Sequence, residues 1–296
     1  MKKAMLLSTV ILLALMSSGY AQDSPQIQGK FDLTYTSKYV WRGFNVFGSK
    51  SAIHPSIDLF FPKTNIGFDL TVHRANSSGY EIAERWDYNL YYMNKLFAGE
   101  MNEIDYRIGY IYYNFPQQSS HTRGDSPAIS GALFNPDCGT YDLQEIHTIL
   151  SFPKILGVEK LVPTYVLVKL WPSNSGTTVG ANSGQGTASG FAHIFMLDYS
   201  VPFTCPLTGI DRDLNLHAEA VYNDGVAPDG GITPVNGAPR GPADSDWSNA
   251  VFGVSTSYDL AENVSFTPGF YYQSSWDSSV NPSDEYWASL SLTCRF

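Results

Sequence analysis

The sequence predicts an all-β fold: a closed antiparallel transmembrane β-barrel of about 12 strands joined in up-and-down order. Three observations lead to this prediction. Apolar and polar residues alternate with period two in segments of roughly 10 residues, the length of a tilted membrane strand. The connections between these segments are alternately short and long. The chain also ends on such a segment, whose last residue is the aromatic Phe296.

The N-terminal residues predict export. Two lysines precede an uncharged apolar run, residues 4–16, and small residues then lead to Ala21. These are the three parts of a cleavable secretory signal peptide, and the apolar run is shorter than the roughly 20 residues of a membrane-spanning helix. We therefore expect residues 1–21 to be a signal peptide and residues 22–296 to form a single outer-membrane β-barrel domain.

The first expected strand, residues 31–42, shows the alternation clearly. Its apolar face carries Phe31, Leu33, Tyr35, Tyr39 and Trp41, and its polar face carries Asp32, Thr34, Thr36, Lys38 and Arg42. The same two-sided pattern recurs in residues 53–61, 66–73, 86–96, 104–114, 143–153, 162–171, 191–202, 212–223, 249–259, 264–273 and 286–296. Segments 143–153 and 162–171 are apolar on both faces, so their orientation is ambiguous.

The connections between the expected strands differ in length at the two ends of the sheet. Short links follow every second strand, at residues 62–65, near Gly99, near Gly157, at 203–211 and at 260–263. The other connections include long polar or Gly/Ser/Pro-rich segments at 115–142, 172–190 and 224–248. Outer-membrane barrels have short periplasmic turns and longer external loops, whereas a secreted β-sandwich, the alternative fold, needs no such asymmetry. The asymmetry therefore favours the barrel.

Composition and charge narrow the choice of partners. The chain has 17 Phe, 19 Tyr, 6 Trp and 25 Gly residues, which suits an aromatic-rich β protein with many turns. Without the two lysines of the signal peptide, 16 basic residues remain against 28 acidic ones, a net charge of −12. This charge argues against binding nucleic acid. Cys138, Cys205 and Cys294 show no metal-ligand spacing and allow at most one bridge, so we expect neither a disulfide framework nor a metal or cofactor.

A membrane barrel separates the two faces of each strand. Backbone N–H and C=O groups have no partner in hydrocarbon, so the sheet must close, with apolar residues toward lipid and polar residues toward the lumen. The candidate lumen-lining residues are Lys38, Arg42, His54, Asp58, Asp69, His73, Asp105, Arg107, His217 and Glu219. Lys169 is expected on the same inner face. The candidates for interfacial aromatic girdles are Trp41, Trp86, Trp171, Tyr199, Tyr258, Tyr272 and Tyr286.

The segment Thr36–Asp58, TSKYVWRGFNVFGSKSAIHPSID, contains an S-x-Y-V-x-R-G box formed by Ser37, Tyr39, Val40, Arg42 and Gly43. The stretch SAIHPSID follows, and the last strand contains W-A-S-L-S-L. In these features the chain resembles the exported TorF-type porin family, with the best match over the first two strands. The resemblance implies an outer-membrane β-barrel of pore function, and it supplies no catalytic residue or substrate.

Arg42 has two interpretations at the outer end of the first strand. A guanidinium that lines a constriction would favour anionic solutes. Alternatively, Arg42 is buried and paired with a wall carboxylate such as Asp58 or Asp69, which is the more ordinary arrangement.

An enzymatic alternative rests on His54, Ser56 and Asp58, the residue types of a serine hydrolase on one face of one strand. The alternation places them inside the barrel, away from lipid, so we expect no enzyme. The leading hypothesis is a narrow channel for passive diffusion of small solutes or ions in the outer membrane of a Gram-negative-type bacterium. The competing hypothesis is a non-conducting structural or adhesive barrel, occluded by the 115–142 loop or by inward Tyr91, Tyr113, Tyr271 and Trp287.

The C-terminal strand carries a further signal. Tyr286, Leu290, Leu292 and Phe296 lie on its apolar face, and a terminal aromatic residue on such a strand resembles the signal by which the barrel-assembly machinery recognises outer-membrane proteins. The expected partners are thus this machinery, membrane lipid and a small solute of unknown identity.

Deletion of Phe296 tests this expectation. We predict that it reduces insertion into the outer membrane far more than it would reduce the stability of a soluble domain, because it removes the assembly signal and the end of the closing strand. Quantitation of the protein in outer-membrane fractions measures the effect. Unchanged membrane levels would count against a barrel.

Overall fold

A computed structural model describes residues 27–116, 142–173, 188–204, 209–228 and 243–296, together with 234–235 and 238–239. The expected signal peptide, Cys138, Cys205 and nearly all of the 115–142 loop lie outside the described residues. Within the described ranges, no helix has the length and apolar character needed to cross a membrane.

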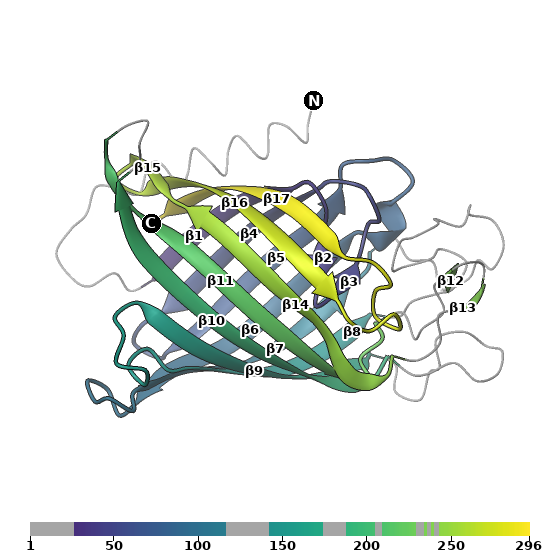
Figure 1. Ribbon diagram of the computed structural model, residues 1–296, viewed down its shortest axis with the longest axis horizontal. Helices are drawn as coiled ribbons and strands as arrows, with labels where there is room; N and C mark the ends of the chain where they lie inside the picture. Colours follow the sequence, from purple (N-terminus) through teal and green to yellow (C-terminus); the bar gives the residue numbers. More distant parts are fainter. Residues whose placement is uncertain are drawn as a thin grey trace.

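The wall is a single antiparallel sheet that closes on itself (Figure 1). Its strands are β1 (Gln28–Thr36), β4 (Ala52–Phe61), β5 (Ile66–Ala75), β6 (Arg85–Leu96), β7 (Ile104–Asn114), β8 (Leu143–Ser151), β9 (Leu161–Pro172), β10 (Gly190–Thr204), β11 (Asp211–Asp224), β14 (Ser245–Thr256), β15 (Tyr258–Ala261), β16 (Val264–Ser275) and β17 (Glu285–Arg295). Both β14 and β15 pair with β16, so they form one interrupted wall strand and the barrel has 12 strands in up-and-down order. The predicted fold class is confirmed.

Several small elements are not part of the wall sheet. They are the hairpin strands β2 (Val40–Trp41) and β3 (Phe44–Asn45), the 3-10 turn η1 (Glu81–Ala83), and the paired β12 (Pro234–Val235) and β13 (Ala238–Pro239). The end of the barrel that carries the long connections is called the outer end below, and the end with the short turns is called the inner end.

The first and last strands close the barrel. β1 pairs with β17 from Lys30 opposite Arg295 to Thr36 opposite Ser289. The pairing continues to the end of the chain, because the N–H of Phe296 donates to the Gly29 carbonyl at 2.9 Å and the Gly29 N–H donates to the Phe296 carbonyl at 2.7 Å. The terminal aromatic residue is therefore part of the seam.

The outward face of the wall is apolar and exposed. Large hydrophobic side chains on this face include Leu90, Ile108, Ile146, Phe195, Leu197, Phe252, Phe270, Leu290 and Leu292, which are 41–57% exposed. A band of this extent on a soluble protein would promote aggregation, whereas in a bilayer it meets hydrocarbon. The outward face therefore fits a transmembrane barrel.

Aromatic rings on the inward face cover glycines of neighbouring strands. A Cβ atom on Gly67 would lie 2.1 Å from the ring of Tyr91, and one on Gly253 would lie 2.5 Å from the ring of Tyr271. Only glycine leaves room for these rings to lie flat on the wall, a device that fixes strand register.

The first strand is shorter than expected. β1 ends at Thr36, and the chain then turns into the lumen, where β2 and β3 form a small hairpin within the barrel (Figure 1). Arg42 and Gly43 form its two-residue turn with φ values of 51° and 91°, as in the tight hairpin turns that require positive φ at both positions. The expectation of one strand over residues 31–42 was wrong, because its alternation runs on into a hairpin that packs inside the sheet.

Candidate functional site

Residues 37–50, the lumen hairpin, occupy the outer half of the barrel interior. Phe44 and Phe47 are 1% and 0% exposed, and Tyr39 and Val46 are also buried. These side chains belong to the same buried cluster as inward residues of the wall, among them Leu143, Val168, Leu170 and Val221. The lumen hairpin thus has a hydrophobic core of its own inside the barrel.

Arg42 reaches across the lumen from the hairpin turn to Glu145 on β8. Its two terminal nitrogens donate to the two carboxylate oxygens at 2.5 and 2.7 Å, and the side chains are only 15% and 1% exposed. The hydroxyl of Tyr113 donates to the same carboxylate at 2.7 Å. Burial lowers the pKa of Arg42, but the charge of Glu145 outweighs burial and the pKa lies above its ordinary value. Two-point pairs of this kind are strong and directional.

The partner of Arg42 differs from the one expected. Asp58 instead accepts a hydrogen bond from the Tyr91 hydroxyl at 2.6 Å, and Asp69 accepts one from Thr71 at 3.3 Å. Both carboxylates lie toward the inner half of the lumen, whereas the hairpin lifts Arg42 to the level of Glu145. Glu145 was not among the expected lumen residues, although it is a single acidic residue within the apolar segment 143–153.

Tyr39 docks the hairpin against β4, β5 and β6. Arg85 donates a hydrogen bond to the Tyr39 hydroxyl at 2.9 Å, and the Tyr39 ring stacks on the His73 ring with centroids 4.8 Å apart. Arg85 also binds Asp87 at 2.7 Å, and Asp87 contacts His73 at 3.0 Å. Burial raises the pKa of Tyr39 well above its ordinary value. The hydroxyl therefore stays neutral, and this polar cluster is part of the docking surface.

The opposite side of the hairpin binds β16, β17 and the loop between them. Lys38 forms an ion pair with Glu285, and the Asn45 amide donates to the same carboxylate at 2.8 Å. The Gly43 carbonyl accepts hydrogen bonds from Gln273 at 3.0 Å and Asn281 at 3.2 Å. The hairpin therefore spans the lumen from β8 to β16 and β17.

Gly43 has a second constraint besides its positive φ. A Cβ atom at this position would lie 2.5 Å from the Asn249 side-chain oxygen and 2.9 Å from Val280. Close approach of the turn to β14 therefore requires glycine. The S-x-Y-V-x-R-G box thus has a physical explanation, because its Tyr39, Arg42 and Gly43 make the docking contacts of the hairpin.

Three residues lie on the opposite side from the one expected, and the first is Tyr39, which docks the hairpin inside the barrel. Trp41 was a girdle candidate, but it lies inside the barrel, with the Arg85 guanidinium 4.2 Å from its ring centroid and the ring of Tyr113 5.5 Å away. Lys169 was expected inside, but it shares the outer face with Phe191, whose ring centroid is 4.3 Å from its ammonium. The inner face of β9 carries Val166, Val168 and Leu170 instead. These residues join the buried cluster around the hairpin, which explains why this segment is apolar on both faces.

Other charged candidates line the inner half of the barrel. Arg107 lies 3.6 Å from the ring centroid of Tyr91. Asp105 pairs with Lys95 at 2.9 Å. His217 contacts Asp198 at 2.7 Å and Glu219 at 4.0 Å. The side chain of Asp198 is 52% exposed, so solvent reaches this half of the lumen.

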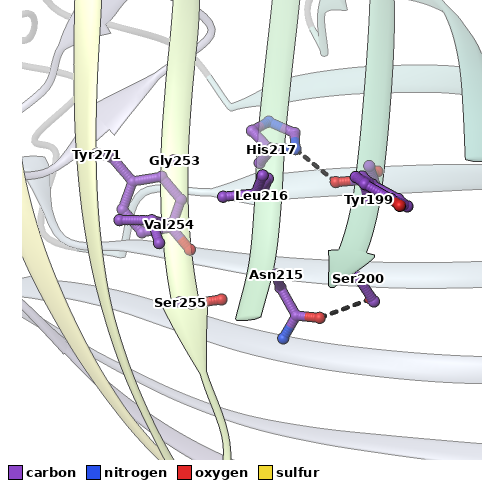
Figure 2. Close-up of a pocket in the computed structure, with 10 residues that line it drawn as sticks. Tyr199, Ser200, Asn215, Leu216, His217, Gly253, Val254, Ser255 and Tyr271 are labelled. Carbon is purple, nitrogen blue, oxygen red and sulfur yellow. Dashed lines mark hydrogen bonds and ion pairs between the residues drawn. The ribbon is translucent and has the colours of Figure 1, made fainter. Parts of the chain in front are cut away.

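A recess opens in the wall of this inner half (Figure 2). Its volume is about 330 Å³. The inward side chains that line this inner recess are Asp198, Ser200, Asn215, His217, Ser255 and Tyr271, with Gly253 among them. They come from four adjacent wall strands: β10, β11, β14 and β16.

The hydrolase residue types do not assemble into a triad. Nε2 of His54 contacts the Thr36 hydroxyl at 2.9 Å, and its Nδ1 contacts His73 at 2.8 Å. Both ring nitrogens are thus engaged away from Ser56. The described ranges also contain no group of three or more His, Cys, Asp or Glu side chains placed to hold a metal ion.

Comparison with known proteins identifies the type of fold. No family model matches the chain, and no curated protein matches it. Among solved structures it is similar to the NanC porin, with a TM-score of 0.51 and 7% identity over 89% of this chain and 98% of that one. This likeness shows the fold alone. The fold is that of an outer-membrane β-barrel.

Two further solved structures are similar at lower scores. The KdgM porin in complex with disordered oligogalacturonate has a TM-score of 0.46 and 8% identity over 91% of this chain and 99% of that one. An outer membrane channel from Pseudomonas putida F1 has a TM-score of 0.48 and 12% identity over 95% of this chain and 98% of that one.

Replacement of Glu145 by Ala tests the docking of the hairpin. The change leaves Arg42 buried without its partner, which costs roughly 3–5 kcal/mol for a buried ion pair, so we expect the hairpin to leave its docked position. Trypsin should then cleave the folded barrel after Lys38 or Arg42, as measured by mass spectrometry of the fragments.

Asp213→Ala is the matched control for this change. It removes an ion pair with Lys160 in which both side chains are more than 40% exposed, a contact worth about 0–1 kcal/mol. No new cleavage is expected in the control. Equal protection of the hairpin in wild type and Glu145→Ala would contradict the docking role of the pair.

Proposed function

We propose that the protein is an outer-membrane channel through which small solutes or ions diffuse passively, and that the lumen hairpin narrows its outer half. The observation that carries this proposal is the combination of a closed wall, a polar inner face with solvent-accessible charged groups, and a hairpin held in the lumen by side-chain contacts. The outward apolar band supports residence in a membrane. Export by a signal peptide over residues 1–21 and insertion through the C-terminal strand complete the proposal.

The polar inner face favours a channel over a purely structural barrel. Asp32, Asp58, Asp69 and Glu219 lie on this face, and none of them forms an ion pair with a lysine or arginine among the described residues. Polar groups without a charged partner are most stable where water reaches them, which fits a wet passage.

The competing function is a non-conducting structural barrel, and the packing of the hairpin is the observation that favours it. Phe44, Val46 and Phe47 are nearly inaccessible to solvent, so the docked hairpin leaves little space on their side of the outer lumen. The resemblance of the S-x-Y-V-x-R-G box to TorF-type porins supports the channel and stays a prediction. Catalysis is not part of the proposal, because His54 is engaged away from Ser56.

Single-channel recording in planar bilayers tests the proposal. Wild type should give small discrete conductance steps, and a variant in which a short Gly/Ser link replaces residues 38–49 should give larger steps, because the outer lumen is then open. Heat-modifiable migration on gels checks that both proteins are folded. Absence of steps from both folded proteins would remove the channel function and leave the structural barrel.

A further inference from the structure

The inner recess lies directly beneath the lumen hairpin. Gln273 and Tyr271 are successive inward residues of β16, and Gln273 donates to the Gly43 carbonyl of the hairpin turn at 3.0 Å. Tyr271, one step further inward, lines the recess. A solute that enters the lumen from the inner end therefore reaches this recess before it meets the hairpin.

The recess has the size and form of a small-molecule site. Its volume of about 330 Å³ lies at the lower end of the roughly 300–1,000 Å³ found for ligand pockets. Such pockets combine apolar or aromatic surface with a few convergent polar groups. Figure 2 shows Ser200, Asn215 and Ser255 at one level of the wall, below the ring of Tyr271 and the imidazole of His217.

Tyr271 forms a rigid aromatic platform in this recess. A Cβ atom on Gly253 would lie 2.5 Å from its ring, and one on Gly269 would lie 3.0 Å away, so the ring rests on the wall between two glycines. Trp287 stacks on it with centroids 5.4 Å apart and an angle of 12° between the planes. The wall and Trp287 thus hold the ring in place, and the part of it that stays accessible lines the recess. A ligand that packs against this part therefore costs little side-chain entropy.

The polar groups around this platform are mainly neutral. The Ser200 hydroxyl donates to the Asn215 side-chain oxygen at 2.7 Å, which leaves the Asn215 amide donors without a hydrogen-bond partner among the described residues. Asn215 can therefore present two N–H donors to a ligand. The Ser255 hydroxyl, which faces the same space, can both donate and accept.

The charges of the recess exclude anionic ligands. Asp198 pairs with His217 at 2.7 Å, Glu219 lies 4.0 Å from the same imidazole, and the recess lining contains no lysine or arginine. An anion would meet the Asp198 carboxylate and no lysine or arginine in the lining, whereas the neutral amide and hydroxyl groups suit an uncharged ligand with many hydroxyls. A pyranose ring has such an edge of hydroxyls and an apolar C–H face that can cover an aromatic ring.

We propose that the inner recess binds a small uncharged sugar, whose apolar face packs against the accessible part of the Tyr271 ring and whose hydroxyls bond to Asn215, Ser200, Ser255 and Asp198. This proposal rests on the proposed solute channel and names its substrate class. In this proposal the sugar binds in the recess on the inner side of the hairpin. There it replaces water at polar side chains that the wall strands already hold in position.

Binding of maltose to the purified full-length barrel in detergent tests the proposal without requiring conduction. Saturation-transfer difference NMR with a maltose titration gives the dissociation constant. Tyr271→Ala should weaken binding by roughly three- to tenfold, while Tyr271→Phe should keep it near the wild-type value because the aromatic ring remains. Asn215→Leu, which removes the free amide donors, should weaken binding in a barrel that keeps its aromatic platform.

Tyr91→Ala is the matched control. Tyr91 also covers an inward glycine, Gly67, but it lies on β6 outside the recess. Its loss should leave maltose binding unchanged. The proposal is overturned if wild type does not bind maltose, if Tyr91→Ala weakens binding as much as Tyr271→Ala, or if gluconate or arginine binds the recess as well as maltose does.

Measurements of conductance and of maltose binding distinguish the channel proposal from the sugar-site proposal. Discrete conductance steps without maltose binding would overturn the sugar site and leave the channel intact. Maltose binding that depends on Tyr271 and Asn215 in a barrel without conductance steps would support the site and remove the channel.

Discussion

The structure depends on one constraint: every backbone N–H and C=O in the hydrocarbon region must find a partner within the sheet. The seam between β1 and β17 meets this constraint and extends to Gly29 and Phe296 at the end of the chain. Closure divides every wall strand into a lipid face and a lumen face. The hairpin, the ion pairs and the inner recess exist only because the lumen face is enclosed.

Closure also creates a space that must be filled with side chains or water. In the outer half, residues 37–50 fill it with an aromatic and aliphatic core, fixed by Arg42 with Glu145 on one side and by Lys38 with Glu285 on the other. Buried ion pairs stabilise a particular arrangement more than they add net stability. These two pairs therefore set where the hairpin sits, while its apolar side chains supply most of the favourable burial.

Much of the wall could be predicted from the sequence, since period two is a local property of each strand. The expected segment 66–73, for example, became β5 at Ile66–Ala75. The hairpin could not be predicted in this way, because Tyr39 and Trp41 continue the alternation of β1 although they pack against the inside of the wall. The partner of Arg42 lies more than a hundred residues away on β8, and only the closed barrel brings Glu145 within reach. The inner recess likewise requires the register of four strands.

The central claim is that docking of the hairpin through Arg42 and Glu145 limits conduction. Single-channel conductance of a charge exchange tests it most directly, with Arg42→Glu, Glu145→Arg and the double variant compared in planar bilayers. Each single change places like charges together in a buried site and should raise the conductance, and the double change should bring it back toward the wild-type value. Wild-type conductance in both single variants would contradict the claim.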